Sequence, residues 1–332
     1  LRTSRLAVRA YPITDEGSGK AASSIPVDAA IRAAASAQST PDRKALVGGR
    51  AVPSRGWLVV NTACSYREYK PHPALADRVW CYWSVHSEQA RDVRITSRGL
   101  SKGHVDLIFA TGGAFCEAAE QSLGETGDLR CYVVGPLPEA ALAHSTGGLC
   151  AVGIKLRPGR AYPLLRTSCS TLAGCPVTVR SIWPEVSSSY LERVADASQA
   201  TERLGLLERI LLARVDKLRS ESAEVRHALD IIGTTRGKTT IDALMEMLDI
   251  GARQLERQFR EQVGLTPIRM CQIARIQHAI ELARAEAKPN WPCIAFECGF
   301  YDQAHLIRHF KSVTGLSPNA YLAEATLKLS EM

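Results

Sequence analysis

The feature that most constrains the fold of this chain is a repeat near its C-terminus, where residues 253–267 recur 51 positions further on. The two copies read RQLERQFREQVGLTP and AHLIRHFKSVTGLSP. In each copy two apolar residues lie four apart, Leu255 and Phe259 in the first and Leu306 and Phe310 in the second, which predicts one buried helix face per copy. Self-similarity at a fixed offset is typical of a duplicated supersecondary unit, so the sequence predicts one helical unit made twice.

Each copy ends with residues that close one helix and begin another. Gly264 and Gly315 stand where a helix would end, because glycine adopts the left-handed conformation at little cost. Thr-Pro or Ser-Pro follows, a pair typical of an N-cap and the first position of a new helix. No further Gly or Pro occurs from Pro267 to Lys288, which predicts a connecting helix of about 20 residues, roughly 30 Å long.

A shorter helix and a turn precede each copy. TTIDALMEMLDIGA precedes the first, where we expect Thr239 to cap the helix, and WPCIAFECGF precedes the second, with a turn around Gly299. Helix, short turn and helix make a helix-turn-helix, whose second helix normally enters the major groove of DNA. Successive major grooves lie about 34 Å apart, so the connecting helix would place two recognition helices in adjacent grooves.

Helix geometry predicts which side chains face the bases. Arginine pairs with guanine, glutamate accepts from cytosine, glutamine suits adenine, and small apolar side chains suit the methyl group of thymine. The alternative for any one of them is a solvated surface residue or an intrahelical ion pair, such as Glu256 with Arg260. The residues expected to face DNA are Arg253, Glu256, Arg257 and Arg260 in the first copy and Gln303, Ala304, Ile307, Arg308 and Lys311 in the second.

Residues 222–325 resemble the DNA-binding domain of the AraC/XylS family of bacterial transcription regulators. The most specific stretch is IAFECGFYDQAHLIRHFKSVTGLSPNAY, with ARIQHAIELA upstream of it. The resemblance implies an all-α double helix-turn-helix domain, adds Gln254 and His305 to the expected DNA contacts, and implies double-stranded DNA and RNA polymerase as partners, with a small-molecule effector and a homodimer as further options. Trp291 and Pro292 depart from the family pattern, which we interpret as variation in core packing.

Charge does not by itself indicate a DNA-binding surface. The chain carries a formal charge of +7, but residues 222–332 contain 13 Lys and Arg against 13 Asp and Glu. A basic domain is the usual electrostatic sign of nucleic-acid binding, and here it is limited to the two recognition helices. The helix-turn-helix motif therefore carries the functional prediction.

The chain upstream of the repeat predicts a different class of fold. Residues 1–56 have few large hydrophobic residues and are expected to be disordered. Short strands at 78–85, 105–111, 130–135 and 149–156, followed by helices within 186–218, predict an α+β domain over 57–221. This domain resembles the sensor region that precedes the DNA-binding domain in part of the AraC/XylS family, which implies a sensor role. The apolar stripe from Leu204 to Val215 would pack on that domain or form a dimer seam. Residues 326–332 are a tail, and no signal or membrane-spanning segment is evident, so a cytoplasmic protein without membrane contact is expected.

The ten cysteines invite a second hypothesis. None of them forms a Cys-x-x-Cys pair, so we expect reduced core thiols and no metal or other cofactor. The alternative is a regulator whose N-terminal domain senses redox state or a metal, or accepts an alkyl group through cysteine. His104 and Asp106 alternate along one predicted strand, which suits either a pocket or a structural pair. The sequence lacks the nucleophile elbow, phosphate loop and zinc-protease motifs, so no enzyme is predicted.

Overall fold

The computed structural model describes the N-terminal region in segments and the C-terminal region as one continuous stretch. The disorder expected for residues 1–56 lies outside the described residues, as does the tail beyond Leu327. The described ranges are 57–59, 65–87, 94–99, 103–112, 129–137, 141–146, 149–173, 176–215 and 221–327.

The N-terminal region, called the sensor domain after its expected role, contains two antiparallel sheets. The smaller has the strand order β1-β4-β7 and the larger has the order β2-β3-β8-β5-β6-β9. The four strands predicted from the sequence are β3, β8, β5 and β6, which lie side by side in the centre of the larger sheet. The strand bounds are β1 (Trp57–Val59), β2 (Ser65–Tyr69), β3 (Val79–Ser87), β4 (Arg94–Gly99), β5 (Val105–Gly112), β6 (Leu129–Val134), β7 (Ala141–Thr146), β8 (Leu149–Leu156) and β9 (Val177–Thr178).

Helices cover one face of the larger sheet and bury it, as expected for an α+β domain. Tyr82, Leu107 and Ile154 share that face because they are paired across β3, β8 and β5. They join one apolar cluster with Leu204, Leu207 and Leu211 of α7, all exposed by 1% or less. The stripe on this helix packs on its own domain, so the dimer-seam interpretation is wrong. The elements are η1 (Pro73–Leu75), α3 (Ala161–Leu165), α4 (Cys169–Leu172), α5 (Val179–Ile182), α6 (Ser188–Asp196) and α7 (Ala200–Val215).

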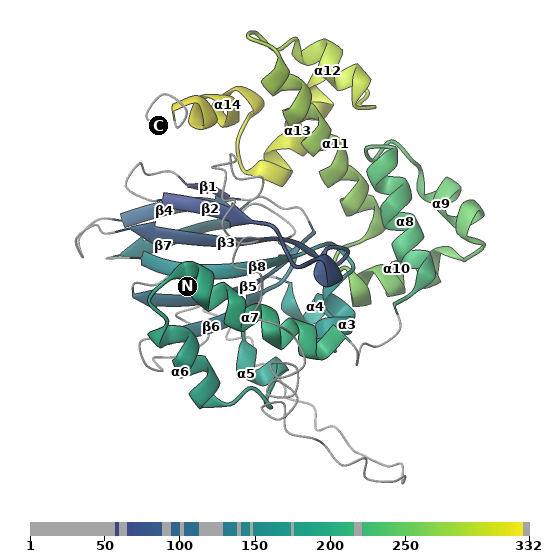
Figure 1. The fold of residues 1–332 in the computed structure, drawn as a ribbon. Coiled ribbons are helices and arrows are strands. Elements are labelled where there is room, and N and C mark those ends of the chain that lie inside the picture. The colour runs from purple at the N-terminus through teal and green to yellow at the C-terminus, as the bar shows by residue number, and fades with distance from the viewer. Residues whose placement is uncertain are drawn as a thin grey trace, which may run out of the picture.

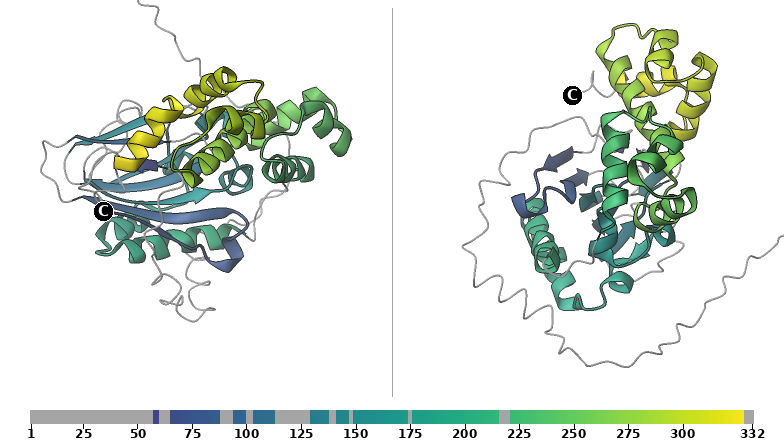
Figure 2. Two further views of the ribbon diagram at one scale, coloured as in Figure 1. Left: turned by 90° about the horizontal axis from the view of Figure 1, so that it is seen from above. Right: turned by 90° about the vertical axis from the view of Figure 1, so that its right-hand side faces the viewer.

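The C-terminal region is all-helical and repeats one unit, as predicted. In Figures 1 and 2, α11 runs from helices α8–α10 to helices α12–α14, which lie at its opposite ends. The first short helix begins one residue later than expected, because Thr240 and not Thr239 accepts the capping hydrogen bond from the Ala243 N–H at 3.1 Å. The helices are α8 (Ala223–Thr234), α9 (Ile241–Leu248), α10 (Ala252–Gln262), α11 (Pro267–Ala285), α12 (Trp291–Glu297), α13 (Gln303–Thr314) and α14 (Pro318–Leu327).

The predicted inward residues form the core of this region. Leu255, Phe259, Leu306 and Phe310 are all fully buried and belong to one apolar cluster that joins both units. The unusual Trp291 packs in the same core, since its ring meets that of Phe310 edge-on at 6.0 Å between centroids. Among the described residues, no helix is both long enough and apolar enough to cross a bilayer.

Candidate nucleic-acid interface

The two turns that lead into the recognition helices α10 and α13 differ in one detail. In the second unit Gly299 takes the left-handed conformation, with φ of 72°. The repeat aligns Leu248 with this glycine, but in the first unit the left-handed residue is Asp249, with φ of 52°. Aspartate tolerates this conformation better than most residues, so the first turn is displaced by one position and still closes.

The two recognition helices nevertheless present equivalent positions. Arg257 and Arg308 are each the sixth residue of their helix, and both are exposed. The fourth and eighth residues of each helix are the buried pairs, which fixes the helix rotation and directs both arginines away from the core. The N-terminal residues of a recognition helix are those that normally reach base edges.

On the first recognition helix, every predicted contact residue is exposed: Arg253, Gln254, Glu256, Arg257 and Arg260. Glu256 and Arg260 also pair with each other at 2.8 Å, one turn apart. The intrahelical alternative is therefore present for this pair. Such exposed pairs contribute little to stability, so either side chain remains able to exchange its partner for DNA.

On the second recognition helix, Gln303, Ala304, Arg308 and Lys311 are exposed, whereas His305 and Ile307 are partly buried. The side chain of Asp302 caps this helix by accepting a hydrogen bond from the His305 N–H at 2.6 Å. The His305 ring meets His309 at 4.5 Å and Phe300 at 5.6 Å between centroids. His305 therefore supports the turn as well as bordering the exposed surface.

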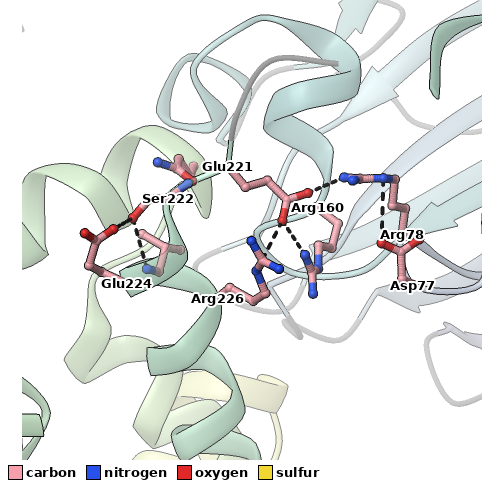
Figure 3. Close-up of polar contacts among 9 residues, drawn as sticks. Asp77, Arg78, Arg160, Glu221, Ser222, Glu224 and Arg226 are labelled. Atoms are coloured by element: carbon pink, nitrogen blue, oxygen red, sulfur yellow. Dashed lines mark hydrogen bonds and ion pairs between the residues drawn. The ribbon is translucent and has the colours of Figure 1, made fainter. Parts of the chain in front are cut away.

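A buried carboxylate joins the first unit to the sensor domain. Glu221, just before α8, accepts hydrogen bonds from Arg78 and Arg160 of the sensor domain (Figure 3). Arg226 of α8 lies 3.8 Å from the same carboxylate. The Glu221 side chain is 7% exposed, so this ion cluster is largely withdrawn from water. This ion cluster could not be predicted from the sequence, because its three arginines are spread over 149 positions of the chain.

The first recognition helix also packs directly on the sensor domain through its C-terminal end. Helix α10 contacts α3 and α4, and Tyr162 of α3 donates a hydrogen bond to Glu261 at 2.8 Å. Gly264 has φ of 78°, and a Cβ there would lie 2.7 Å from the carbonyl oxygen of Cys169. Glycine is therefore required both to end the helix and to let the two domains approach. The predicted DNA-contact residues of this helix stay exposed despite this packing.

The sensor domain contains a buried polar cluster on the second face of its larger sheet. His104 Nε2 and Asp106 Oδ2 lie 3.0 Å apart, and Trp83 donates to Asp106 at 3.2 Å. Burial alone would raise the pKa of Asp106, but the charges of His104 and Lys155 outweigh burial and hold that pKa below its usual value. The Lys155 ammonium is buried and has no hydrogen-bond partner among the described residues.

Most of the described cysteines are buried or partly buried thiols, whereas Cys293 is exposed. Burial raises the pKa of the Cys131 and Cys169 thiols to about 12, and chiefly burial raises that of Cys298 to about 11. The thiolate is the reactive form, so these three cysteines are poor nucleophiles at neutral pH. Cys64, Cys116 and Cys175 lie outside the described residues.

Two helix-turn-helix units on one connecting helix define the C-terminal region as a tandem helix-turn-helix DNA-binding domain. Residues 244–324 match the family model described as a helix-turn-helix domain. The chain is 35% identical over 77 residues to the transcriptional activator RhaS of Escherichia coli strain SE11, and 34% identical to RhaS of strain E24377A. This C-terminal domain belongs to the AraC family, as the resemblance in its sequence implied.

The other comparisons are less informative. Residues 67–177 match a family described as a domain of unknown function. The aligned segment is 23% of this chain and 27% of RhaS. The structure of ToxT from Vibrio cholerae is 10% identical, with a TM-score of 0.40 over 73% of this chain and 98% of ToxT. The C-terminal domain of AraT from Geobacillus stearothermophilus is 27% identical, with a TM-score of 0.28 over 30% of this chain and 84% of that domain.

Proposed function

We propose that this chain is a sequence-specific transcription regulator that reads two adjacent major grooves with α10 and α13. The observation that carries the proposal is the equivalence of Arg257 and Arg308, both exposed at the sixth position of helices joined by one 19-residue connecting helix. Activation is the expected direction, because the matched relatives are named transcriptional activators. RNA polymerase is then a partner besides double-stranded DNA.

The proposal includes a division of the chain into a sensor domain over 57–221 and a DNA-binding domain over 222–325. Two separate apolar clusters support it, one in the sheet and its helices and the other in α8–α14. The sensor domain would modulate DNA binding through the first unit, since Glu221 and Tyr162 tie that unit to it.

A small-molecule effector would act at the polar cluster of the sensor domain. An ammonium group that is buried without a hydrogen bond is costly, and a ligand oxygen beside Lys155 would relieve that cost. Asp106 lies opposite Lys155 on the neighbouring strand, and Asp106 together with His104, just before β5, would help to orient the ligand. A homodimer is a further option, in which two chains would bind neighbouring sites.

Residues 222–332 alone are expected to bind a specific duplex as a monomer, because this fragment has its own apolar core and both recognition helices. Purified fragment should give one shifted complex on a selected duplex, with the mass of one chain per duplex. A fragment that binds only as a dimer to a palindrome, or that shows no preference over random DNA, would contradict the two-helix proposal.

Replacing Glu221 by glutamine is expected to weaken the joint between the domains. The neutral amide can accept a hydrogen bond from one arginine but removes the negative charge that Arg78 and Arg160 share, which should cost about 1–2 kcal/mol of unfolding free energy. Chemical unfolding of the full chain measures the change. Arg226→Ala is the matched control, because this arginine is 50% exposed and 3.8 Å away, and it should cost less than about 0.5 kcal/mol. Equal effects of the two substitutions on the unfolding free energy would contradict the proposal that the Glu221 carboxylate joins the two domains.

A further inference from the structure

Two arginines of the connecting helix α11 contact the second unit, one at the C-terminal end of α13 and the other at the turn before α13. Arg269 donates to the side-chain oxygen of Ser312 at 2.9 Å and to its carbonyl oxygen at 3.0 Å. Ser312 lies in the last turn of α13, where the final carbonyl groups of a helix lack intrahelical donors. One guanidinium therefore holds both the side chain and the backbone at the C-terminal end of this helix.

Arg275 contacts the turn that precedes the N-terminal end of α13. Its guanidinium donates to the carbonyl oxygen of Gly299 at 3.2 Å and stacks over the ring of Phe300 at 5.1 Å. Phe300 in turn meets the rings of His305 and His309 on α13, at 5.6 and 5.8 Å between centroids. The turn that sets the start of the second recognition helix is thus fixed to α11 through Arg275.

The first unit is attached to the same connecting helix by different contacts. Arg236, just after α8, lies 2.8 Å from a ring nitrogen of His278 on α11. Gly237 follows it with φ of 74°, and a Cβ there would lie 2.2 Å from the carbonyl oxygen of Cys271. The two units therefore share one rigid element between them.

We propose that Arg269 and Arg275 are positioning residues that set the angle at which α13 enters DNA, and that they thereby restrict the chain to one spacing between its two half-sites. The inference rests on the proposed function, because it concerns how the two recognition helices bind one duplex. A guanidinium suits this role because its planar fork makes several hydrogen bonds in fixed directions. Neither arginine needs to contact a base.

The physical consequence is a strict spacing rule. One inserted base pair moves the second half-site by about 3.4 Å and turns it by roughly 35° around the DNA axis. A stiff connection gains from two half-sites only when their separation matches its own length, whereas a loose connection tolerates neighbouring separations. Loss of the arginine contacts should therefore change the affinity most for duplexes whose half-site spacing differs from the selected one.

The test measures affinity of the full chain for duplexes that carry its selected half-sites at the selected spacing, one base pair shorter and one base pair longer. We expect the wild-type chain to bind the duplexes of altered spacing at least about tenfold more weakly than the duplex of selected spacing. For the Arg269→Gln/Arg275→Gln variant, the same change of spacing should lower the affinity by about threefold or less. For each protein the readout is the ratio of its affinity at the selected spacing to its affinity at an altered spacing. A general loss of affinity caused by the lost positive charge therefore cancels. Arg284→Gln is the matched control on the same helix, since Arg284 lies over the Tyr321 ring of α14, and its spacing ratio should equal that of the wild type.

The outcomes separate this inference from the proposed function. If the wild-type chain selects no two-part site, the proposed function fails. If it selects one and the double variant keeps the wild-type spacing ratio, only the positioning role is overturned. Should the double variant bind no duplex, Arg269→Lys decides, because it keeps the charge but lacks the fork: a relaxed spacing ratio supports the inference and an unchanged ratio overturns it.

Discussion

Replacing Phe310 by alanine is expected to lower the unfolding free energy of the DNA-binding domain by about 3–5 kcal/mol, the usual range for a buried phenylalanine. Phe310 is fully buried and packs edge-on against Trp291 and Tyr321, at 6.0 and 5.6 Å between ring centroids. The cavity would lie directly under the second recognition helix. We therefore expect α12–α14 to lose order first, which chemical unfolding and hydrogen exchange would measure.

Phe259→Ala is the matched comparison, because Phe259 holds the same place in the first unit and is equally buried. The first unit is also packed against the sensor domain, so its helices should keep more of their hydrogen-exchange protection. On DNA, each variant should lose its own half-site and keep contacts at the other. A Phe310→Ala chain that is destabilised by less than about 1 kcal/mol would contradict the packing described for this core.

Arg257→Ala and Arg308→Ala should each cost about 1–3 kcal/mol of binding free energy and relax specificity at one position of the DNA site. The two side chains lie on separate units, so the losses should be nearly additive in the double variant, about 2–6 kcal/mol. The two relaxed positions should lie roughly 10 bp apart. Binding-site selection repeated with each variant at fixed salt makes the measurement.

Lys311→Ala serves as the control for these arginines. Lys311 is exposed on α13 and is expected to meet a phosphate, so its loss should weaken binding to all sequences alike and lower the salt slope by about one unit. If both arginine variants behave as this lysine variant does, with unchanged sequence preferences, the arginines contact the backbone and the assignment of base reading is wrong.

The helical half of the molecule could be predicted from the sequence because its determinants are local. Leu255, Phe259, Leu306 and Phe310 lie at helical spacing, and the glycines and prolines between them mark the helix ends. The errors are single-residue shifts at ends, such as Thr240 in place of Thr239, where two neighbouring hydroxyls offer the same cap.

The contacts between elements distant in sequence could not be predicted. Tyr162 and Glu261 lie 99 positions apart, and neither residue belongs to a pattern that marks an interface. The same holds for Arg269 and Ser312, 43 positions apart, although both stand inside helices that the sequence predicts correctly. In the sensor domain the central strands were evident from continuous apolar runs, whereas β2 (SYREY) is polar at most positions and gave little signal.

Selection of bound duplexes from random DNA with the full chain at fixed salt shows directly whether one chain binds a two-part site. We predict a two-part motif with two different half-sites about 10 bp apart, bound by one chain. A single short motif, a palindrome bound only by two chains, or no enriched sequence would contradict the claim that α10 and α13 read adjacent major grooves.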